Sequence, residues 1–519
     1  MDKRYKTVVI GTGFGGSVMA YQLAKEEGSV CILERGRRYR RSDFASTSRE
    51  ITFWNAGQGL IDFHGSADMD VVMAAGVGGG LLIYANVHLQ AEEEVFENWP
   101  GGLDLKKLEP YYDRVRYMLK VTPFPGAPEV TKGQVLTDAA KKLGHTVRSP
   151  ELAIYFGQAG KEVDDPFDRG GPTQTGCNFC GRCVTGCPYH AKNTLDLNYL
   201  YLAEHQYGAQ IYPIHEALCV KPAEDGPGYT VQFQNHETGE TGSVTGDRMV
   251  LAAGSIGSTA LLLRSKQYLS DLSPTLGNRF SPNGDFLAAA IFTDDPVNPT
   301  IGPTITTMVD YRDGPNLIIE EGGFPEMMAW YARSFYPNTG AFRRLLRVFY
   351  LRFIRRLWSR QPLNSDKLLR TLFHGSTSPA ANMLPFLCIG NDASDGRITL
   401  DETGRVVVQW KNRKSMRLWK LMERETKRLA KGMDGIRVLN PAWSLGQKLV
   451  TVHPLGGCSM GDSVAEGVTA PNGEIFNYPN LFVADGAIIP KAIGVNPAMT
   501  IAAVAEYIAS GIINQERES

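Results

Sequence analysis

The chain has 519 residues, of which 43% are hydrophobic and 21% are charged, and its formal net charge is -1. This composition is typical of a globular protein, the length favours two domains over one, and the near-neutral charge excludes the basic surface that nucleic acid requires. No apolar run is long enough to cross a bilayer, and no secretory leader precedes the first predicted strand. We therefore expect a cytoplasmic protein, unless a partner subunit with its own export signal carries the folded chain across a membrane.

The first predicted elements form a nucleotide-binding unit. A β-rich run over residues 5–10 leads directly into Gly11-Thr12-Gly13-Phe14-Gly15-Gly16, then into a helix through Lys25 and a second strand that ends at Glu34. The glycines permit a tight turn and the close approach of a pyrophosphate to the helix N-terminus, and Glu34 is placed to accept hydrogen bonds from ribose hydroxyls. A chance glycine turn is the alternative, but strand, glycines, helix, strand and acid in this order predict a dinucleotide site.

Three later segments carry related signals. One is a glycine run after an apolar stretch, which leaves bare backbone for a cofactor to approach, although a structural turn is the alternative. The other two are buried strands that end in glycine turns, and we expect them to return to the same doubly wound sheet, with an aspartate at a strand's carboxyl end. The candidate cofactor contacts in these segments are Gly76, Gly78, Gly79, Gly80, Ala253, Gly254, Asp485 and Gly486.

Four cysteines follow the spacing CxxCxxCxxxCP, which is typical of loops that hold iron–sulfur clusters. They are Cys177, Cys180, Cys183 and Cys187. The spacing predicts a [3Fe-4S] or [4Fe-4S] cluster, while a structural zinc knot or plain thiols and disulfides are the alternatives. The remaining cysteines are scattered along the chain, and we expect them to be small core residues: Cys31, Cys219, Cys388 and Cys458.

Several motifs occur together in one order along the chain. They are the Gly11–Gly16 fingerprint with Glu34, the Gly76–Gly80 run, residues 253–258, His453-Pro-Leu-Gly-Gly457, Asp485-Gly486 and Asn496-Pro497. In this order they resemble the glucose-methanol-choline (GMC) oxidoreductases, and most closely the cholesterol-oxidase-like branch. The resemblance implies noncovalently bound FAD, with Asn496 and Pro497 among its contacts. It also implies an α/β, Rossmann-type FAD-binding domain assembled from discontinuous segments, and an α+β substrate domain with a mainly antiparallel sheet.

On this basis we assign residues 1–120, 195–275 and 440–519 to the FAD-binding domain. Residues 121–194, which include the cysteine loop, and residues 276–439 form the substrate domain. Two departures from the family pattern stand out. Leu81 replaces the small hydroxyl residue that often follows the glycine run. The cysteine run is similar to that of cluster-bearing dehydrogenase relatives, which favours an acceptor other than oxygen.

Alcohol oxidation by a flavin requires a base that takes the hydroxyl proton, and histidine has a suitable pKa. His453 precedes a Pro-Leu-Gly-Gly turn that presents its ring, and the resemblance gives it this role, although a structural histidine is the alternative. Asn496 is the implied second polar group, which orients without titrating, although Asn-Pro before an apolar run is also a good helix start. Glu326 resembles the active-site glutamate of cholesterol oxidases and, if buried, could serve as a base, including for isomerising an enone; a solvated glutamate at a helix start is the alternative.

Residues 342–358, from Phe342 to Trp358, place aromatic and leucine side chains on one helical face and six arginines on the other side. This pattern indicates peripheral contact with an anionic membrane surface or an acidic partner, or else a packing helix with a solvated basic side.

The sequence thus predicts an FAD-dependent alcohol dehydrogenase for a hydrophobic, steroid-like or long-chain alcohol. Its electrons would pass through the iron–sulfur cluster to an external acceptor, such as a quinone, a cytochrome or a small redox protein. One alternative is an oxygen-using oxidase without a functional cluster. Another is a flavin-dependent isomerase or lyase, or an electron-transfer subunit.

Overall fold

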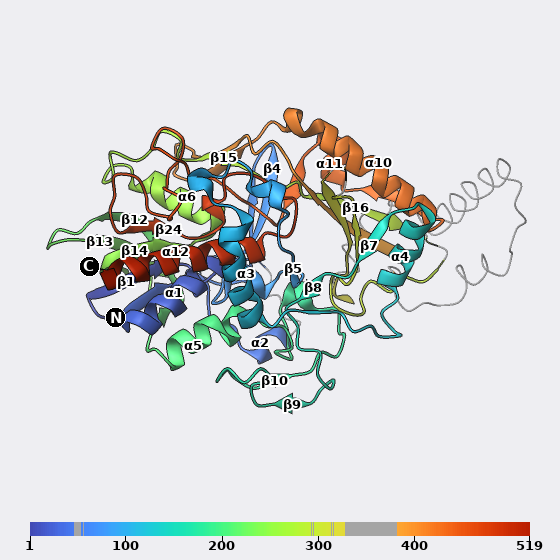
Figure 1. Cartoon of the computed structure of the whole chain (residues 1–519), viewed down its shortest axis with the longest axis horizontal. Helices are drawn as coiled ribbons and strands as arrows, with labels where there is room; N and C mark the ends of the chain where they lie inside the picture. The colour runs from blue at the N-terminus through green and yellow to red at the C-terminus, as the bar shows by residue number, and fades with distance from the viewer. Residues whose placement is uncertain are drawn as a thin grey trace, which may run out of the picture.

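The computed structural model describes residues 1–45, 53–55, 57–291, 293, 295–312, 314, 316–326 and 381–518. Its larger sheet lies in the half of the molecule that holds both termini, and a second large sheet lies in the other half (Figure 1). The candidate active-site residues described below come from both halves, so the arrangement of the two sheets positions the candidate site.

The larger sheet has seven strands with a parallel centre. The strand order is β11 (Gln210–Tyr212), β2 (Val30–Leu33), β1 (Arg4–Ile10), β14 (Thr241–Leu251), β13 (Tyr229–Asn235) and β12 (His215–Pro222), and β24 (Leu481–Val483) also pairs with β14. β14 is long enough to pair with antiparallel β13 through its first half and with parallel β24 through its last residues. All four residues of β2 are buried, as expected for a central parallel strand that is covered on both faces.

Helices cover this sheet. α1 (Phe14–Glu27) starts at the first glycine turn and ends at Gly28, whose φ of 73° suits a residue without a side chain. α12 (Ala498–Glu518) packs against α1 and α3 (Leu105–Leu119), and in Figure 1 it crosses the half of the molecule that holds both termini. α5 (Tyr199–His205) also packs on α1, and α6 (Gly254–Ser265) follows β14.

The second sheet has six strands, and every neighbouring pair is antiparallel. The strand order is β22 (Ile436–Leu439), β16 (Phe286–Ile291), β19 (Met383–Gly390), β18 (Leu317–Glu321), β17 (Met308–Asp310) and β7 (Thr146–Arg148). α10 (Met416–Gly432) packs on β16 through a buried face that includes Trp419 and Met422, and α4 (Lys132–Lys142) packs against α10. The indole of Trp419 stacks near Phe286 of β16, with 6.3 Å between ring centroids.

Short elements join the two halves. The strands are β3 (Ile61–Gly65), β4 (Met69–Ala74), β23 (Leu449–Thr451), β5 (Val87–His88), β6 (Thr122–Pro123), β8 (Glu151–Leu152), β9 (Glu162–Val163), β10 (Gln174–Thr175), β15 (Asn278–Phe280), β20 (Gly396–Leu400) and β21 (Val406–Gln409). The short helices are α2 (Arg41–Ala45), η2 (Gly79–Leu82), η3 (Glu93–Phe96), η4 (Pro100–Gly102), η5 (Cys183–Thr185), η6 (Leu195–Leu197), η8 (Asn412–Ser415), α11 (Pro441–Gly446) and η9 (Gly486–Ile488).

These observations confirm the predicted fold class, a Rossmann-type sheet plus a second domain with a mainly antiparallel sheet. The strands of the larger sheet fall within the segments predicted for the FAD-binding domain, and the exact domain boundaries stay a prediction. Among the described residues, no helix is both long and apolar enough to cross a membrane. The predicted amphipathic helix over residues 342–358 lies outside the described residues.

Candidate active site and cysteine cavity

The predicted cofactor residues meet at one edge of the larger sheet. Gly11 follows β1, Glu34 follows β2, Ala253 follows β14 and Asp485 follows β24, and these four strands run parallel. The carboxyl ends of parallel strands share one edge, which is where open α/β sheets bind ligands. The structure therefore places the residues from three distant segments at one candidate nucleotide site.

A hydrogen-bond chain through Thr12 ties the two glycine segments together. The Thr12 hydroxyl donates to Glu34 Oε2 at 2.5 Å, and the Gly78 N–H donates to the same hydroxyl at 3.2 Å. Glu34 also accepts the N–H of Gly36 at 2.9 Å. Burial raises the pKa of Glu34, and these hydrogen bonds oppose that rise. Glu34 thus fixes the turn in addition to its predicted role toward the ribose.

The glycines at this edge divide into two kinds. A Cβ at Gly15 would lie 1.5 Å from the carbonyl oxygen of Ala484, and a Cβ at Gly79 would lie 2.6 Å from the Cα of Gly13, so these glycines let backbones pack. A Cβ at Gly13 or Gly80 would meet no heavy atom within 4 Å. Bare backbone beside free space at the N-terminus of α1 suits the pyrophosphate of FAD. Gly16 is another glycine that lets backbones pack. A Cβ at Gly76 would meet the side chains of Tyr39 and Leu82.

Asp485 holds the far side of the candidate FAD site. Its carboxylate accepts the N–H groups of Gly254 at 2.8 Å and Ala487 at 2.7 Å, and the hydroxyl of Ser258 at 2.5 Å. Burial raises the pKa of Asp485 to about 6, although these hydrogen bonds lower it. The carboxylate therefore fastens the starts of α6 and of η9, which begins at Gly486, to the sheet edge.

His453 lies beside a buried carboxylate that the sequence analysis did not identify. Asp285 Oδ1 is 2.7 Å from His453 Nδ1. Asp285 Oδ2 accepts the Thr451 hydroxyl and the Val452 N–H, each at 2.8 Å. Burial lowers the pKa of His453, but the charge and hydrogen bond of Asp285 outweigh it, so the pKa lies above the ordinary value. Because Nδ1 is engaged by the carboxylate, Nε2 is the nitrogen left to take a proton.

Asn496 lies beside a second carboxylate, that of Glu320 on β18. The Asn496 amide donates to Glu320 Oε2 at 3.3 Å, and both side chains are buried. Within the described residues, Asn496 Oδ1 and Glu320 Oε1 are buried without a hydrogen-bond partner. Buried polar atoms of native proteins are normally paired, so these two atoms indicate a place for a ligand group. Asn496 is followed by Pro497 and the start of α12, in line with the predicted helix start.

Glu326 does not take part in this group. It is exposed, six residues beyond Glu320, and it follows the end of β18. Glu320 is instead the glutamate that contacts Asn496, and burial raises its pKa to about 8 against the lowering effects of Asn496 and His453. We therefore favour Glu320 over Glu326 as the candidate glutamate, and the role expected of Glu326 stays a prediction. The sequence held a readable signal, because two acids close the otherwise apolar strand Leu317–Glu321.

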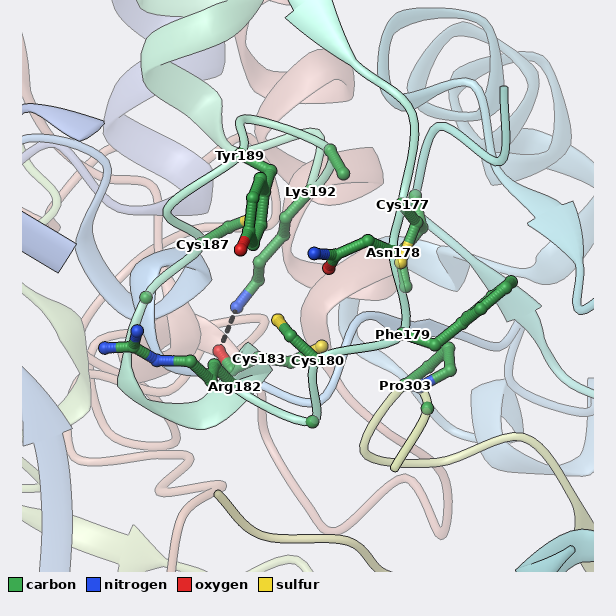
Figure 2. A pocket seen from close by; sticks show the side chains of 15 residues that line it. Cys177, Asn178, Phe179, Cys180, Arg182, Cys183, Cys187, Tyr189, Lys192 and Pro303 are labelled. Carbon is green, nitrogen blue, oxygen red and sulfur yellow. Dashed lines mark hydrogen bonds between the residues drawn. The ribbon is translucent and has the colours of Figure 1, made fainter. Parts of the chain in front are cut away.

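All four cysteines of the predicted cluster loop line one cavity with about 350 Å³ of empty space, part of it open to solvent. Figure 2 shows the four side chains around this cavity, with Lys192 running between Cys187 and the carbonyl of Cys183. The loop is held between both halves of the molecule. Its η5 turn packs on η2, and Gly302 donates its N–H to the Phe179 carbonyl at 2.8 Å.

Backbone N–H groups point at the sulfur atoms. Phe179 and Arg182 supply such hydrogen bonds to Cys177 and Cys180, and Tyr189, Ala191 and Lys192 supply them to Cys187. Burial nevertheless raises the pKa of all three thiols, to about 11 for Cys180. Any metal group must therefore displace protons on binding. The other four cysteines are buried, which confirms their prediction as core residues.

In the part of the chain that the structure describes, no group of three or more His, Cys, Asp or Glu side chains is arranged for a metal ion. The predicted iron–sulfur cluster and the zinc alternative therefore both stay predictions.

Comparisons with known proteins agree with this geometry. Family models described as GMC oxidoreductase match residues 155–278 and 392–505. The chain is 30% identical over 550 residues to a cholesterol oxidase of Mycobacterium tuberculosis (strain ATCC 25618 / H37Rv), covering 98% of this chain and 91% of the relative. It is also 30% identical over 561 residues to a cholesterol oxidase of Acinetobacter baumannii, with 98% and 94% covered. A long-chain-alcohol oxidase of Arabidopsis thaliana is 24% identical over 541 residues, with 98% and 68% covered.

Solved structures share the fold at lower identity. Pyridoxine 4-oxidase from Mesorbium loti superimposes with a TM-score of 0.64 at 16% identity, covering 98% of this chain and 99% of that one. Formate oxidase of Aspergillus oryzae RIB40 gives 0.65 at 14% identity, with 99% of each chain covered.

A Rossmann-type sheet with a dinucleotide edge, joined to an antiparallel sheet that contributes to the same site, defines a flavin-dependent oxidoreductase. The chain belongs to the GMC oxidoreductase family, as its full-length relatives show. It is accordingly an FAD-dependent oxidoreductase that acts on CH–OH groups.

Proposed function

We propose that this protein oxidises a hydrophobic alcohol, steroid-like or long-chain, and that its electrons leave through an iron–sulfur cluster in the cysteine cavity. The observation that carries the proposal is the contact of Asn496 with Glu320, each of which has an unpartnered buried polar atom, beside His453, whose charge acts on Glu320. FAD, when bound at the sheet edge, supplies the acceptor for the hydride of the alcohol carbon.

The protein's own residues handle the proton. Oxidation of the alcohol to the carbonyl releases one hydride and the hydroxyl proton. His453 Nε2 takes the proton, because Asp285 engages Nδ1 and stabilises the imidazolium that forms. Asn496 orients the substrate oxygen through its amide. Glu320, with a pKa of about 8, is mostly protonated at neutral pH and therefore adds no negative charge beside the developing alkoxide.

The register of β18 and β19 supports an apolar substrate. Glu320 pairs with Leu387, and on the same face Ile318 pairs with Ile389. Ile318 and Ile389 belong to the apolar cluster that continues into the FAD-binding half. The sheet therefore presents apolar side chains beside Glu320, which favours a hydrocarbon framework with a single polar group. The relatives include proteins named cholesterol oxidase and long-chain-alcohol oxidase, and both names refer to hydrophobic alcohols.

The acceptor is the second part of the proposal. A cluster, when bound by the four cysteines, would pass single electrons to an external acceptor such as a quinone, a cytochrome or a small redox protein. The supporting features are the four cysteines around one cavity, the N–H groups that point at their sulfurs, and the packing of the loop on η2. Oxygen as the direct acceptor is the second candidate, because the named relatives are oxidases.

Two measurements on anaerobically purified protein test the proposal. The first is iron, acid-labile sulfide and zinc per FAD, with Cys183→Ala alongside and Cys458→Ala as the matched core cysteine. About three or four irons per FAD in the wild type and in Cys458→Ala, and fewer in Cys183→Ala, are expected. Absence of iron after anaerobic reconstitution would remove the cluster from the proposal.

The second measurement is turnover of sterols and long-chain alcohols, in air and without oxygen, with and without an artificial one-electron acceptor. Turnover that needs the acceptor supports a dehydrogenase, and acceptor-independent peroxide formation supports the oxidase. If no alcohol of either class reduces the FAD anaerobically, the proposed substrate class is wrong.

A further inference from the structure

Lys192 is a buried cation at the wall of the cysteine cavity. Its side chain is only 2% exposed, and Nζ donates to three carbonyl oxygens: Tyr84 at 2.8 Å, Cys183 at 2.9 Å and Leu82 at 3.3 Å. Nζ also lies 4.7 Å from the centre of the Tyr84 ring. These contacts are well suited to an ammonium group, which has three donors and favours an aromatic face.

The surroundings leave the charge of Lys192 without a close anion. Among the described residues, no carboxylate lies within ion-pair distance of Nζ, and Asp196 interacts with it only at longer range. A buried ammonium is costly unless a negative charge compensates it. The charges that act on Nζ come, in decreasing order, from the thiols of Cys183 and Cys187 when they are deprotonated and from the buried carboxyl of Asp196. The buried charge therefore indicates that the cavity accommodates an anionic occupant, as thiolates around a cluster would be.

Lys192 also bridges the cysteine loop and the FAD-binding half. Cys183 begins η5, whereas Leu82 ends η2 and Tyr84 follows it. The Tyr84 ring in turn packs edge-on against Phe14, the first residue of α1, at 5.8 Å between centroids. One lysine thus connects a predicted cluster ligand with the two glycine turns of the candidate FAD site.

We propose that Lys192 is the charge-compensating and positioning residue of the iron–sulfur cluster. Its ammonium group offsets the negative charge of the cluster and its thiolates, and its three hydrogen bonds hold Cys183 against the FAD-binding turn. This inference rests on the proposed function, because it requires a cluster in the cavity. A positive charge beside a cluster favours the reduced, more negative state, so removing the charge lowers the reduction potential.

The test is a redox titration of the cluster followed by electron paramagnetic resonance on anaerobically purified holoenzyme. Lys192→Met removes the charge and the donors, and Lys192→Gln removes the charge but keeps a donor for the carbonyls. Lys106→Met, at an exposed position of α3, is the control. We expect a more negative cluster potential in both Lys192 variants, an unchanged potential in the control, and an unchanged content of FAD in all three.

The outcomes separate this inference from the proposed function. A wild type without iron would overturn the cluster part of the proposed function, and with it the role of Lys192. A wild type with iron, together with a wild-type potential in both Lys192 variants, would overturn the role of Lys192 alone. Loss of iron with retention of FAD in either variant supports the positioning role.

If neither variant folds, pulsed electron paramagnetic resonance of wild-type protein whose lysines carry ¹⁵N only at Nζ decides. Nζ of Lys192 lies 2.9 Å from the carbonyl oxygen of Cys183 at the wall of the cavity, so a ¹⁵N coupling from the ammonium group to the cluster is expected. Its absence from a protein that holds a cluster would overturn the inference.

Discussion

Asp285 Oδ1 lies 2.7 Å from Nδ1 of His453, and the other oxygen of this carboxylate is held by Thr451 and Val452. Asp285 precedes β16 of the antiparallel sheet, whereas His453 follows β23. The pair therefore crosses between the two halves of the molecule and directs Nε2 of the imidazole away from the carboxylate. This relationship gives His453 a fixed tautomer and a raised pKa.

Asp285→Asn should move the acidic limb of the pH profile to lower pH. The carboxylate raises the pKa of His453, and a base must be deprotonated to act, so loss of the charge lets His453 act at lower pH. The maximum rate should fall, because the imidazolium loses its stabilising partner. The measurement is kcat/KM against pH with anaerobic FAD reduction as the readout. An acidic limb that stays in place would show that Asp285 is only structural.

His453→Ala should lower the rate of FAD reduction by about 10²–10⁴-fold, the range typical of general-base catalysis. FAD should remain bound, because the hydrogen bonds that shape the FAD edge come from Thr12, Glu34 and Asp485. Single-turnover reduction separates this effect from acceptor steps. His205→Ala, at an exposed position of α5, is the control histidine and should reduce FAD at the wild-type rate.

Glu320→Gln should retain activity at neutral pH and remove an alkaline limb near pH 8. Burial raises the pKa of Glu320 to about 8, so a neutral glutamine resembles its protonated state below that pH. Above it, ionised Glu320 disfavours negative charge on the substrate oxygen. Glu326→Gln at the exposed position should keep the wild-type profile. The reverse result, an altered profile only in Glu326→Gln, would restore Glu326 as the active-site glutamate.

The fold could be predicted from the sequence because the patterns that indicate its turns and strands each span only a few residues. The first glycine turn lies between a strand and a helix, so Gly11, Gly13 and Glu34 could be placed from sequence order alone. Ser394 likewise precedes β20, and Gly404 lies in the turn that joins β20 to the antiparallel β21. Such patterns depend on backbone geometry within a few residues.

The contacts between the candidate site residues could not be predicted from the sequence, for the opposite reason. Asp285 and His453 are 168 positions apart, and Asn496 and Glu320 are 176 apart, so only tertiary packing brings each pair together. Glu326 was chosen over Glu320 because a motif likeness cannot report burial. Lys192 gave no signal at all, since an isolated lysine in a loop is ordinarily solvated.

Gly13→Ala and Gly15→Ala should separate FAD binding from folding. A Cβ at Gly13 meets no heavy atom and the backbone there is extended, so Gly13→Ala should fold normally but bind FAD more weakly. A Cβ at Gly15 would lie 1.5 Å from the Ala484 carbonyl oxygen, so Gly15→Ala should destabilise the protein itself. Thermal unfolding of apo-protein and FAD titration measure the two effects. Equal FAD affinity in Gly13→Ala and wild type would show that FAD does not approach this turn.

Lys132→Met should destabilise the protein by about 3–5 kcal/mol, the range for breaking a buried ion pair by removing one partner. Lys132 Nζ lies 2.6 Å from Glu321 Oε2, and both side chains are 0% exposed. Glu321 also accepts from the hydroxyl and N–H of Thr306, so it cannot move to solvent without losing these bonds. Denaturant unfolding at a fixed FAD concentration measures the loss of stability. The double variant Lys132→Met with Glu321→Leu should recover part of that loss, because it removes the unpaired carboxylate.

The loss in Lys132→Met should grow with pH. Burial raises the pKa of Glu321, and Lys132 opposes that rise. Without Lys132 the folded protein holds Glu321 protonated, whereas the unfolded chain releases that proton above its ordinary pKa. A carboxyl whose pKa is higher in the folded protein than in the unfolded chain therefore lowers the free energy of unfolding as the pH rises. A loss that is independent of pH would mean that Glu321 stays ionised in the variant, with solvent reaching the site in place of the lysine.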